Sequence, residues 1–121
     1  NNYVSMPTST INSVFAIAEK KKSLSGESWT VKVGPVPKSI GTVCIDEFYI
    51  PKGDTTFYEA MEGDVIHFCK GGIDARLQSV CSFLCARNPR WGRFNPDVSV
   101  AEQIDIPAPL LSRFDLIFPI R

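Results

Sequence analysis

The sequence has no excess of either charge, since its thirteen Lys and Arg residues are matched by thirteen Asp and Glu residues. Bulk charge therefore predicts no polyanionic partner, and any contact with nucleic acid has to come from a local patch. There is also no apolar run long enough to span a membrane and no signal-peptide pattern. The chain starts at Asn1 rather than Met, so we expect a processed chain or an excised fragment, with residues 1–9 as an irregular lead-in.

Cysteine and histidine are too sparse to suggest a zinc site. The sequence has one histidine, His67, and no CxxC pair, whereas structural zinc sites use closely spaced Cys and His ligands. Free cysteine is among the most buried residue types, so we expect buried, reduced thiols of the kind found in cytosolic proteins. The four cysteines are Cys44, Cys69, Cys81 and Cys85.

The most informative stretch is residues 42–48, Thr-Val-Cys-Ile-Asp-Glu-Phe. A short apolar run between turn residues, Gly41 before and Pro51 after, predicts a buried parallel strand. Asp46 and Glu47 would then lie at its C-terminal end, where open α/β sheets bind ligands. This is the Walker B pattern of P-loop ATPases, in which the first acid helps to hold Mg²⁺ and the second polarises the attacking water. A strand that ends in a solvated acidic turn is the alternative.

The sequence lacks a phosphate loop. The one candidate, residues 34–39, is too short between its glycine and its lysine, and Pro35 and Pro37 remove backbone donors that would cradle phosphate. The main nucleotide cradle is therefore absent, and we expect the chain alone to be inactive as an ATPase.

The region before the acidic strand allows two structures. Residues 10–22 have apolar positions at helical spacing, with Ser9 or Thr10 as the cap, but they are equally compatible with a strand that enters a hairpin. The alternation in residues 29–33 predicts the return strand. The lysine run at residues 20–22 is by itself typical of a solvated loop.

After the acidic strand, residues 55–62 are predicted to form a short helix that is capped by Asp54 and ended by Gly63. Residues 64–73 predict a strand followed by a tight turn, with Lys70 at its tip. A single lysine at a hairpin tip is usually only solvated.

The C-terminal third predicts two more apolar strands, residues 77–86 and 116–120, with a short helix from Val98 between them. Asn88 follows the first of these strands, so its amide could hydrogen-bond a water or a γ-phosphate. Arg113 precedes the second strand, at the end opposite to the acids. From there its charge could reach a neighbouring subunit's phosphate, as an arginine finger does.

Together these motifs resemble the AAA+ core of the minichromosome maintenance (MCM) replicative helicases. The similarity runs from about residue 29 to residue 120 and is closest to archaeal members around residues 101–107. The matching blocks are the Walker B stretch 43–48, the helix 59–62, the sensor 1 segment 88–90 with the loop 92–96, and the arginine-finger block 110–118.

The resemblance implies an α/β fold, a partial P-loop AAA+ core with parallel strands, flanking helices and two β-hairpin inserts. It assigns ATP and Mg²⁺ as cofactors, with Asp46 on the metal and Glu47 acting on water. Asn88 would sense the γ-phosphate, Arg113 would act in trans, and Lys70 would contact DNA. A phosphate contact of this kind carries no sequence information.

The implied domain covers residues 1–121 without Walker A, with residues 14–33 as the helix-2 insert hairpin and 64–73 as the pre-sensor-1 hairpin. The implied assembly is a homo-oligomer, a hexameric ring on single-stranded or duplex DNA that drives ATP-dependent unwinding in replication, with no membrane partner. The implied location is intracellular, in the cytoplasm or nucleoid of an archaeon or the nucleus of a eukaryote.

The sequence departs from the family pattern in three places. Residues 49–51 replace the usual Asp-Lys-Met, Val80 replaces an arginine, and Arg87 replaces a small residue beside the sensor asparagine, where a cation could help nucleotide binding or disturb the water.

Two rival interpretations of the function stay open. One is a chelatase-type or MoxR-type AAA+ remodeller, and the other is a degenerate paralogue that serves only as an interface or DNA-binding module.

Overall fold

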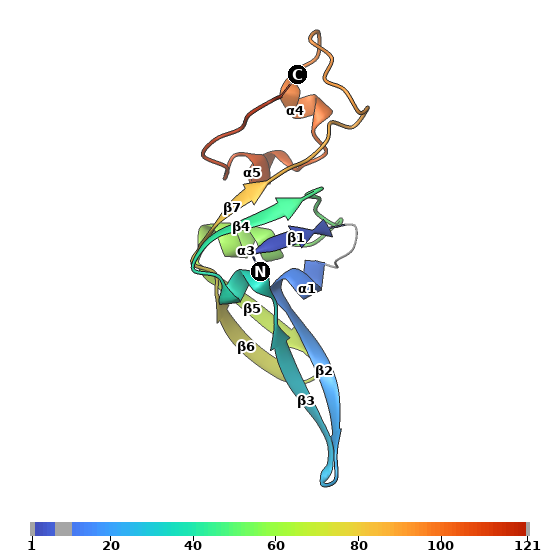
Figure 1. Cartoon of the computed structure of the whole chain (residues 1–121), viewed down its shortest axis with the longest axis vertical. Helices are drawn as coiled ribbons and strands as arrows, with labels where there is room; N and C mark the ends of the chain where they lie inside the picture. The colour runs from blue at the N-terminus through green and yellow to red at the C-terminus, as the bar shows by residue number, and fades with distance from the viewer. Residues whose placement is uncertain (1, 7–10, 121) are drawn as a thin grey trace.

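A computed structural model describes residues 2–6 and 11–120. A three-stranded parallel sheet in the order β1-β4-β7 lies at its centre, and two antiparallel hairpins project away from it (Figure 1). The strands are β1 (Tyr3–Ser5), β2 (Ala16–Ser23), β3 (Gly26–Val33), β4 (Gly41–Asp46), β5 (Val65–Lys70), β6 (Ile73–Gln78) and β7 (Cys81–Cys85). The helices are α1 (Ile11–Phe15), α2 (Pro35–Lys38), α3 (Thr56–Glu62), α4 (Val100–Gln103) and α5 (Ala108–Leu111).

β4 is the middle strand of the sheet. Its β-branched residues Val43 and Ile45 are buried, and Ile45 lies between Val4 of β1 and Cys85 of β7, both in parallel register. A strand with a partner on each side hydrogen-bonds along both edges, so its position is tightly fixed. The predicted buried parallel strand, and with it the α/β class with two hairpins, is confirmed.

The core beside the sheet is aromatic. The ring of Phe57, from the first turn of α3, meets those of Phe15, Phe48 and Phe83 edge-on, with centroids 4.8, 5.0 and 5.9 Å away. Edge-to-face pairs of this kind add to the energy of simple burial. Phe57 therefore joins α1, the end of β4 and β7 in one packed cluster.

The predicted short helix is present as α3. The Asp54 carboxylate accepts a hydrogen bond from the Thr56 backbone N–H at 2.8 Å, although the capping position itself is Thr55. At the other end the N–H of Gly63 donates to the carbonyl of Glu59. Both ends thus satisfy groups that a helix leaves unpaired.

The region before the acidic strand combines the two predicted structures, because the five-residue helix α1 runs straight into β2. Gly34 closes this hairpin by donating to the Phe15 carbonyl at 2.7 Å. A Cβ at this glycine would lie 2.4 Å from the carbonyl oxygens of Ser13 and Val14, so only glycine fits. The expected helix cap, Ser9 or Thr10, lies outside the described residues.

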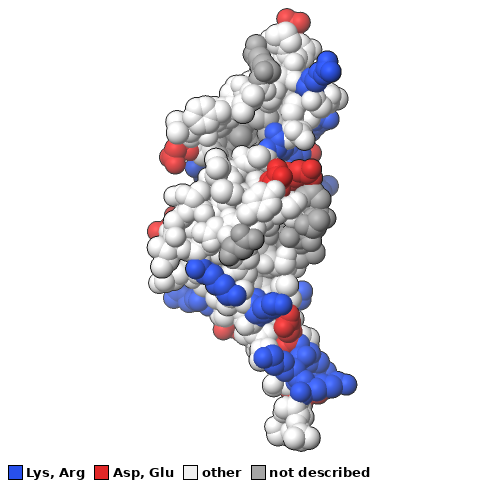
Figure 2. All heavy atoms as spheres, viewed as in Figure 1, with Lys and Arg blue, Asp and Glu red and all other residues white. Residues whose placement is uncertain are grey.

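Basic side chains gather over the two hairpins, whereas the chain as a whole is neutral (Figure 2). The first hairpin extends farthest from the sheet, and the segment with α4 and α5 lies at the opposite end of the molecule (Figure 1). The molecule therefore has a basic end at the two hairpins and an opposite end that carries α4 and α5.

Three sequence predictions about strands are wrong. The strand expected at residues 77–86 is two elements, because Leu77 pairs with Ile66 inside the second hairpin and β7 starts only at Cys81. The strand expected at 116–120 is absent, since these exposed residues pair with no strand in the described part of the chain. The expected lead-in contains β1, which is three residues long and pairs with β4.

The thiols are free but less buried than expected. Cys69 on the second hairpin is exposed, and the other three cysteines are only partly buried. Among the described residues, no helix is long and apolar enough to cross a membrane.

We predict that Phe57→Ala lowers the free energy of unfolding by about 3–5 kcal/mol, because the substitution removes a fully buried ring from the centre of the aromatic cluster. Urea unfolding measures this loss. Leu24→Ala at the exposed tip of the first hairpin is the control and should change stability by no more than about 0.5 kcal/mol. Equal small losses for both variants would show that the cluster is not the stabilising core.

Candidate functional site

The two acidic residues lie where β4 ends. The backbone there is fixed by the burial of the next residue and by hydrogen bonds to the segment after β7. Glu47 has a positive φ of 52°, which is uncommon outside glycine and costs free energy unless the surroundings fix it. The next residue, Phe48, is fully buried, its N–H donates to the Ala86 carbonyl at 2.8 Å, and its own carbonyl accepts from Arg87 Nη1 at 2.7 Å. The chain therefore turns sharply at Glu47 and leaves that side chain exposed at the edge of the sheet.

Asp46, the last residue of β4, is held by two hydrogen bonds. Its Oδ1 accepts from the Glu47 backbone N–H at 3.0 Å, and its Oδ2 accepts from the Tyr3 hydroxyl at 2.9 Å. The hydrogen bond to Asp46, with smaller contributions from burial and from the nearby acids, raises the pKa of the Tyr3 phenol above its ordinary value. Sequence reasoning missed Tyr3, because a three-residue strand has too little pattern to be recognised.

Asn88 comes to the same edge of the sheet as the two acids. β7 runs parallel to β4, with Cys85 level with Ile45, so the residues that follow both strands leave the sheet at the same edge. Asn88 is exposed there. A side-chain amide offers both donors and an acceptor, so this edge combines two carboxylates with one neutral hydrogen-bonding group.

The acids fit a magnesium ion that arrives with a phosphate ligand. The Asp46 carboxylate has about four acceptor positions, of which the two hydrogen bonds use only part. Mg²⁺ is typically bound through one or two carboxylates together with substrate phosphates and water. Within residues 2–6 and 11–120, no group of three His, Cys, Asp or Glu side chains could hold a metal ion by itself.

Arg87 does not project freely toward a ligand at this edge. Besides its bond to the Phe48 carbonyl, its Nη2 lies 3.6 Å from Asp105 Oδ2, and Arg90 Nη2 donates to the other oxygen of the same carboxylate at 2.9 Å. The side chain is only 22% exposed. The expected cation beside a γ-phosphate is therefore committed to tying Phe48 to the segment after α4.

A second residue that sequence reasoning missed, Gln103, shapes the loop after Asn88. Its buried side chain accepts from the Asn95 N–H at 2.6 Å and donates to the carbonyls of Asn95 and Val98. Its own carbonyl accepts from the Arg90 N–H. A buried amide with its groups satisfied rigidifies its surroundings. A glutamine in a polar helix carries no sequence signal for such a role.

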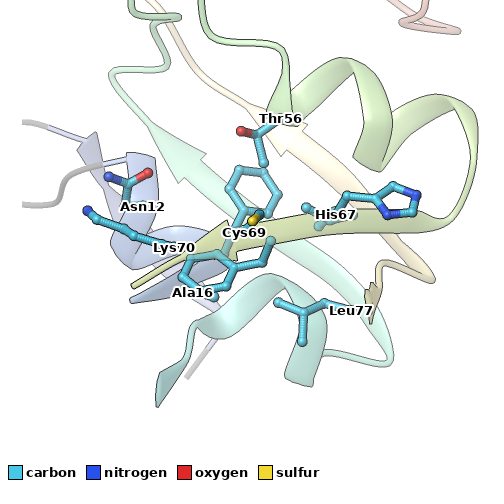
Figure 3. A pocket seen from close by; sticks show the side chains of 10 residues that line it. Asn12, Ala16, Thr56, His67, Cys69, Lys70 and Leu77 are labelled. Carbon is cyan, nitrogen blue, oxygen red and sulfur yellow. The ribbon is translucent and has the colours of Figure 1, made fainter. Parts of the chain in front are cut away.

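Lys70 lies at the end of β5, directly before the turn of the second hairpin. Its side chain lines a cavity of about 170 Å³ between α1, the start of β2, α3 and β5. Figure 3 shows Lys70 and Asn12 together at one end of this cavity and His67 at the other. None of the residues that line this cavity comes from the acidic edge, so the lysine belongs to the basic hairpin region.

Arg113 follows α5 and packs against α3. Its Nη2 donates to Glu62 Oε2 at 2.9 Å, its Nη1 donates to the Pro109 carbonyl, and its guanidinium lies over the Tyr58 ring with 5.0 Å to the centroid. None of its contacts among the described residues is with Asp46, Glu47 or Asn88. The structure thus groups the acids and Asn88 at one edge, with Lys70 and Arg113 elsewhere.

A parallel sheet with an acid pair after the central strand and an amide after its neighbour defines a partial P-loop-type α/β domain. The comparisons identify the family, because the MCM P-loop domain matches residues 1–121. The chain belongs to the MCM family.

Two similar proteins are uncharacterized MCM-type proteins of Methanocaldococcus jannaschii. The first is 52% identical over 124 residues, which cover all of this chain and 18% of that protein. The second is 48% identical over 122 residues, which cover 99% and 16%. DNA replication licensing factor mcm7-B of Xenopus laevis is 45% identical over 83 residues, which cover 67% of this chain and 12% of that protein. The chain therefore spans less than a fifth of the length of these three relatives.

Cys85 lies beneath the acidic edge and has a strongly perturbed thiol. Burial, with a smaller contribution from Cys44 on the neighbouring strand, raises the pKa of Cys85 to about 12. An unfolded chain would release this proton near pH 9, the ordinary value for the group. The stability that depends on the neutral thiol is therefore fully present below pH 9 and is lost as the pH rises toward about 12.

We predict that stability falls more steeply above pH 9 in the wild type than in Cys85→Ala, by up to about 1.4 kcal/mol per pH unit. Urea unfolding between pH 8 and pH 11 measures both slopes, and the comparison removes the contribution of groups that titrate in both proteins. Identical slopes would show that the folded thiol ionises as readily as the unfolded one.

Proposed function

We propose that this chain is the part of an MCM-type hexameric motor that hydrolyses ATP and contacts DNA, and that the assembled ring unwinds DNA in replication. One observation carries the proposal. Asp46, Glu47 and Asn88 leave adjacent parallel strands at the same edge of the sheet, where nucleotide-binding α/β proteins place their ligands. The family membership supports the same function.

Each residue at the edge has a distinct task. Asp46 would hold the Mg²⁺ of MgATP, and that ion would supply charge neutralisation at the phosphates. Glu47 is exposed beside it and would orient and polarise the attacking water, as the second Walker B acid does. Asn88 would hydrogen-bond the γ-phosphate or the water. Because the backbone around Phe48 is fixed, these groups need little rearrangement when the nucleotide binds.

The remaining candidates act outside this edge. Arg113 would reach the nucleotide of a neighbouring subunit in the ring, and Lys70 would hold a DNA phosphate without reading sequence. A motor of this kind works inside the cell, on the genome.

A second candidate is a ring-interface or DNA-binding module without hydrolysis, favoured by the departures from the family pattern at Val80 and Arg87, since Arg87 is tied to Phe48 and Asp105 beside the sensor asparagine. Grafting the chain into an MCM-type polypeptide that supplies a phosphate loop discriminates between the two. The proposed function expects MgATP hydrolysis that Glu47→Gln abolishes. A graft that assembles and binds ATP, but hydrolyses it at the same low rate with and without Glu47→Gln, would favour the module.

We predict that Arg113→Ala in the graft retains ATP binding and loses hydrolysis by about 10³- to 10⁵-fold, the usual contribution of an arginine finger. Because Glu47 and Arg113 would serve opposite sides of an interface, mixing the Arg113→Ala and Glu47→Gln proteins should restore part of the single-site turnover.

Glu62→Gln is the matched control for Arg113, because it removes the partner of the same ion pair without removing the arginine. If Arg113 is only structural, both variants should leave the rate per assembled interface unchanged, although Arg113→Ala should lower stability more, because it also removes the contacts with the Pro109 carbonyl and the Tyr58 ring. That result would overturn the trans assignment.

We predict that Lys70→Ala weakens DNA binding to a similar extent for all sequences. The slope of log affinity against log salt should fall by roughly one unit for each DNA phosphate that the lysine no longer neutralises. Fluorescence anisotropy with labelled oligonucleotides measures both quantities. Lys38→Ala in α2 is the control, since it removes the same charge from an exposed residue that belongs to neither hairpin. If Lys70→Ala behaves like this control, the lysine is a solvated tip residue.

A further inference from the structure

Trp29 of β3 joins the two hairpins at a point directly beside Lys70. A Cβ built on Gly71 would lie 3.2 Å from Cδ2 and 3.3 Å from Cε3 of the indole ring. The ring therefore lies against Gly71 in the turn that follows Lys70. Since consecutive Cα atoms are only about 3.8 Å apart, Lys70 is directly beside the residue that the ring contacts. The indole ring is therefore one point of contact between the two hairpins.

A large part of the same ring is open to solvent. Trp29 is 47% exposed, and it takes part in none of the close ring pairs among the described residues. Burying an aromatic side chain is strongly favourable, so a half-covered indole at a hairpin turn offers a ready surface for a flat, apolar partner. Isolated exposed aromatic side chains are common, so a binding role for Trp29 has to be judged from the residues around it.

Those surroundings are basic. The strands of the two hairpins carry six Lys and Arg residues against three Asp and Glu residues, a net charge of +3. Lys20 lies directly opposite Trp29 in the hairpin register, on the face that also carries Lys22 and Glu27. Glu27 forms ion pairs with both lysines, so it offsets this charge only in part.

We propose that Trp29 is a base-stacking platform for single-stranded DNA. An unpaired base stacks on the open part of the indole ring, and Lys70 and Lys20 contact the phosphates on either side. The inference rests on the proposed function, because it uses the same DNA-contacting hairpin. Aromatic platforms beside basic grooves bind single strands in this way, whereas the bases of a duplex are already stacked on each other.

The test uses the 121-residue chain with Trp91→Phe, so that Trp29 is the only tryptophan left. Adding an oligo-dT strand should quench its fluorescence to saturation. In anisotropy titrations Trp29→Ala should weaken binding of that strand by about 5- to 150-fold, the usual loss for one stacked base. Affinity for a duplex should change less than about twofold, and the salt slope should stay the same, because no charge is removed.

Two pairs of variants separate stacking from a loss of structure. Trp29→Phe keeps an aromatic ring and should retain most of the affinity that Trp29→Ala loses. Gly71→Ala and Gly72→Ala both strain a turn residue of positive φ, +61° and +76°, but only the Cβ at Gly71 meets the ring. Gly71→Ala should therefore weaken single-strand binding more than Gly72→Ala, with circular dichroism reporting that both variants fold.

The outcomes distinguish this inference from the proposed function. If Lys70→Ala weakens binding and lowers the salt slope while Trp29→Ala changes nothing, the stacking platform is wrong and the DNA-contacting hairpin stands. If Trp29→Ala weakens single strand and duplex equally and also lowers the salt slope, the ring only positions Lys70, which again overturns stacking. If the unsubstituted chain binds no DNA, the stacking platform is overturned for residues 1–121, whereas hydrolysis by the graft tests the proposed ATPase site separately.

Discussion

The burial of Phe48 is the interaction on which the candidate site depends. Its ring packs against Phe57 with centroids 5.0 Å apart, so the residue cannot leave the core without a large loss of apolar packing. Its backbone groups bond Ala86 and Arg87, the two residues that precede Asn88. One buried side chain thereby fixes the strained backbone of Glu47 and connects it to the segment that carries the amide.

The same aromatic cluster reaches the basic end of the molecule. Phe57 also packs on Phe15, the last residue of α1, and β2 of the first hairpin begins at the next residue. That hairpin meets the second one through Trp29 and Gly71. A continuous path of packed side chains and paired strands therefore joins the acidic edge to the two basic hairpins, and under the proposed function this path would couple hydrolysis to movement.

Sequence reasoning succeeded where a pattern was local. The apolar run before Asp46 predicted the central parallel strand, and the Asp54 and Gly63 signals bounded α3. It failed where a structure depends on distant partners. Residues 116–120 have strand composition but no neighbouring strand among the described residues, whereas Tyr3 has almost no pattern and still pairs beside Asp46. The bonds of Arg87 and Gln103 join segments that only the fold brings together, so no spacing in the sequence could have revealed them.

The most direct test of this account is a double-mutant cycle between Glu47→Gln and Asn88→Ala, read as the rate of ATP hydrolysis in an assembled graft that supplies a phosphate loop. If the Phe48 linkage makes these residues one catalytic unit, their effects are strongly non-additive, and the double variant is hardly slower than the slower single variant. Independent effects, with the two losses multiplying, would contradict the claim that the two strand ends form a single site.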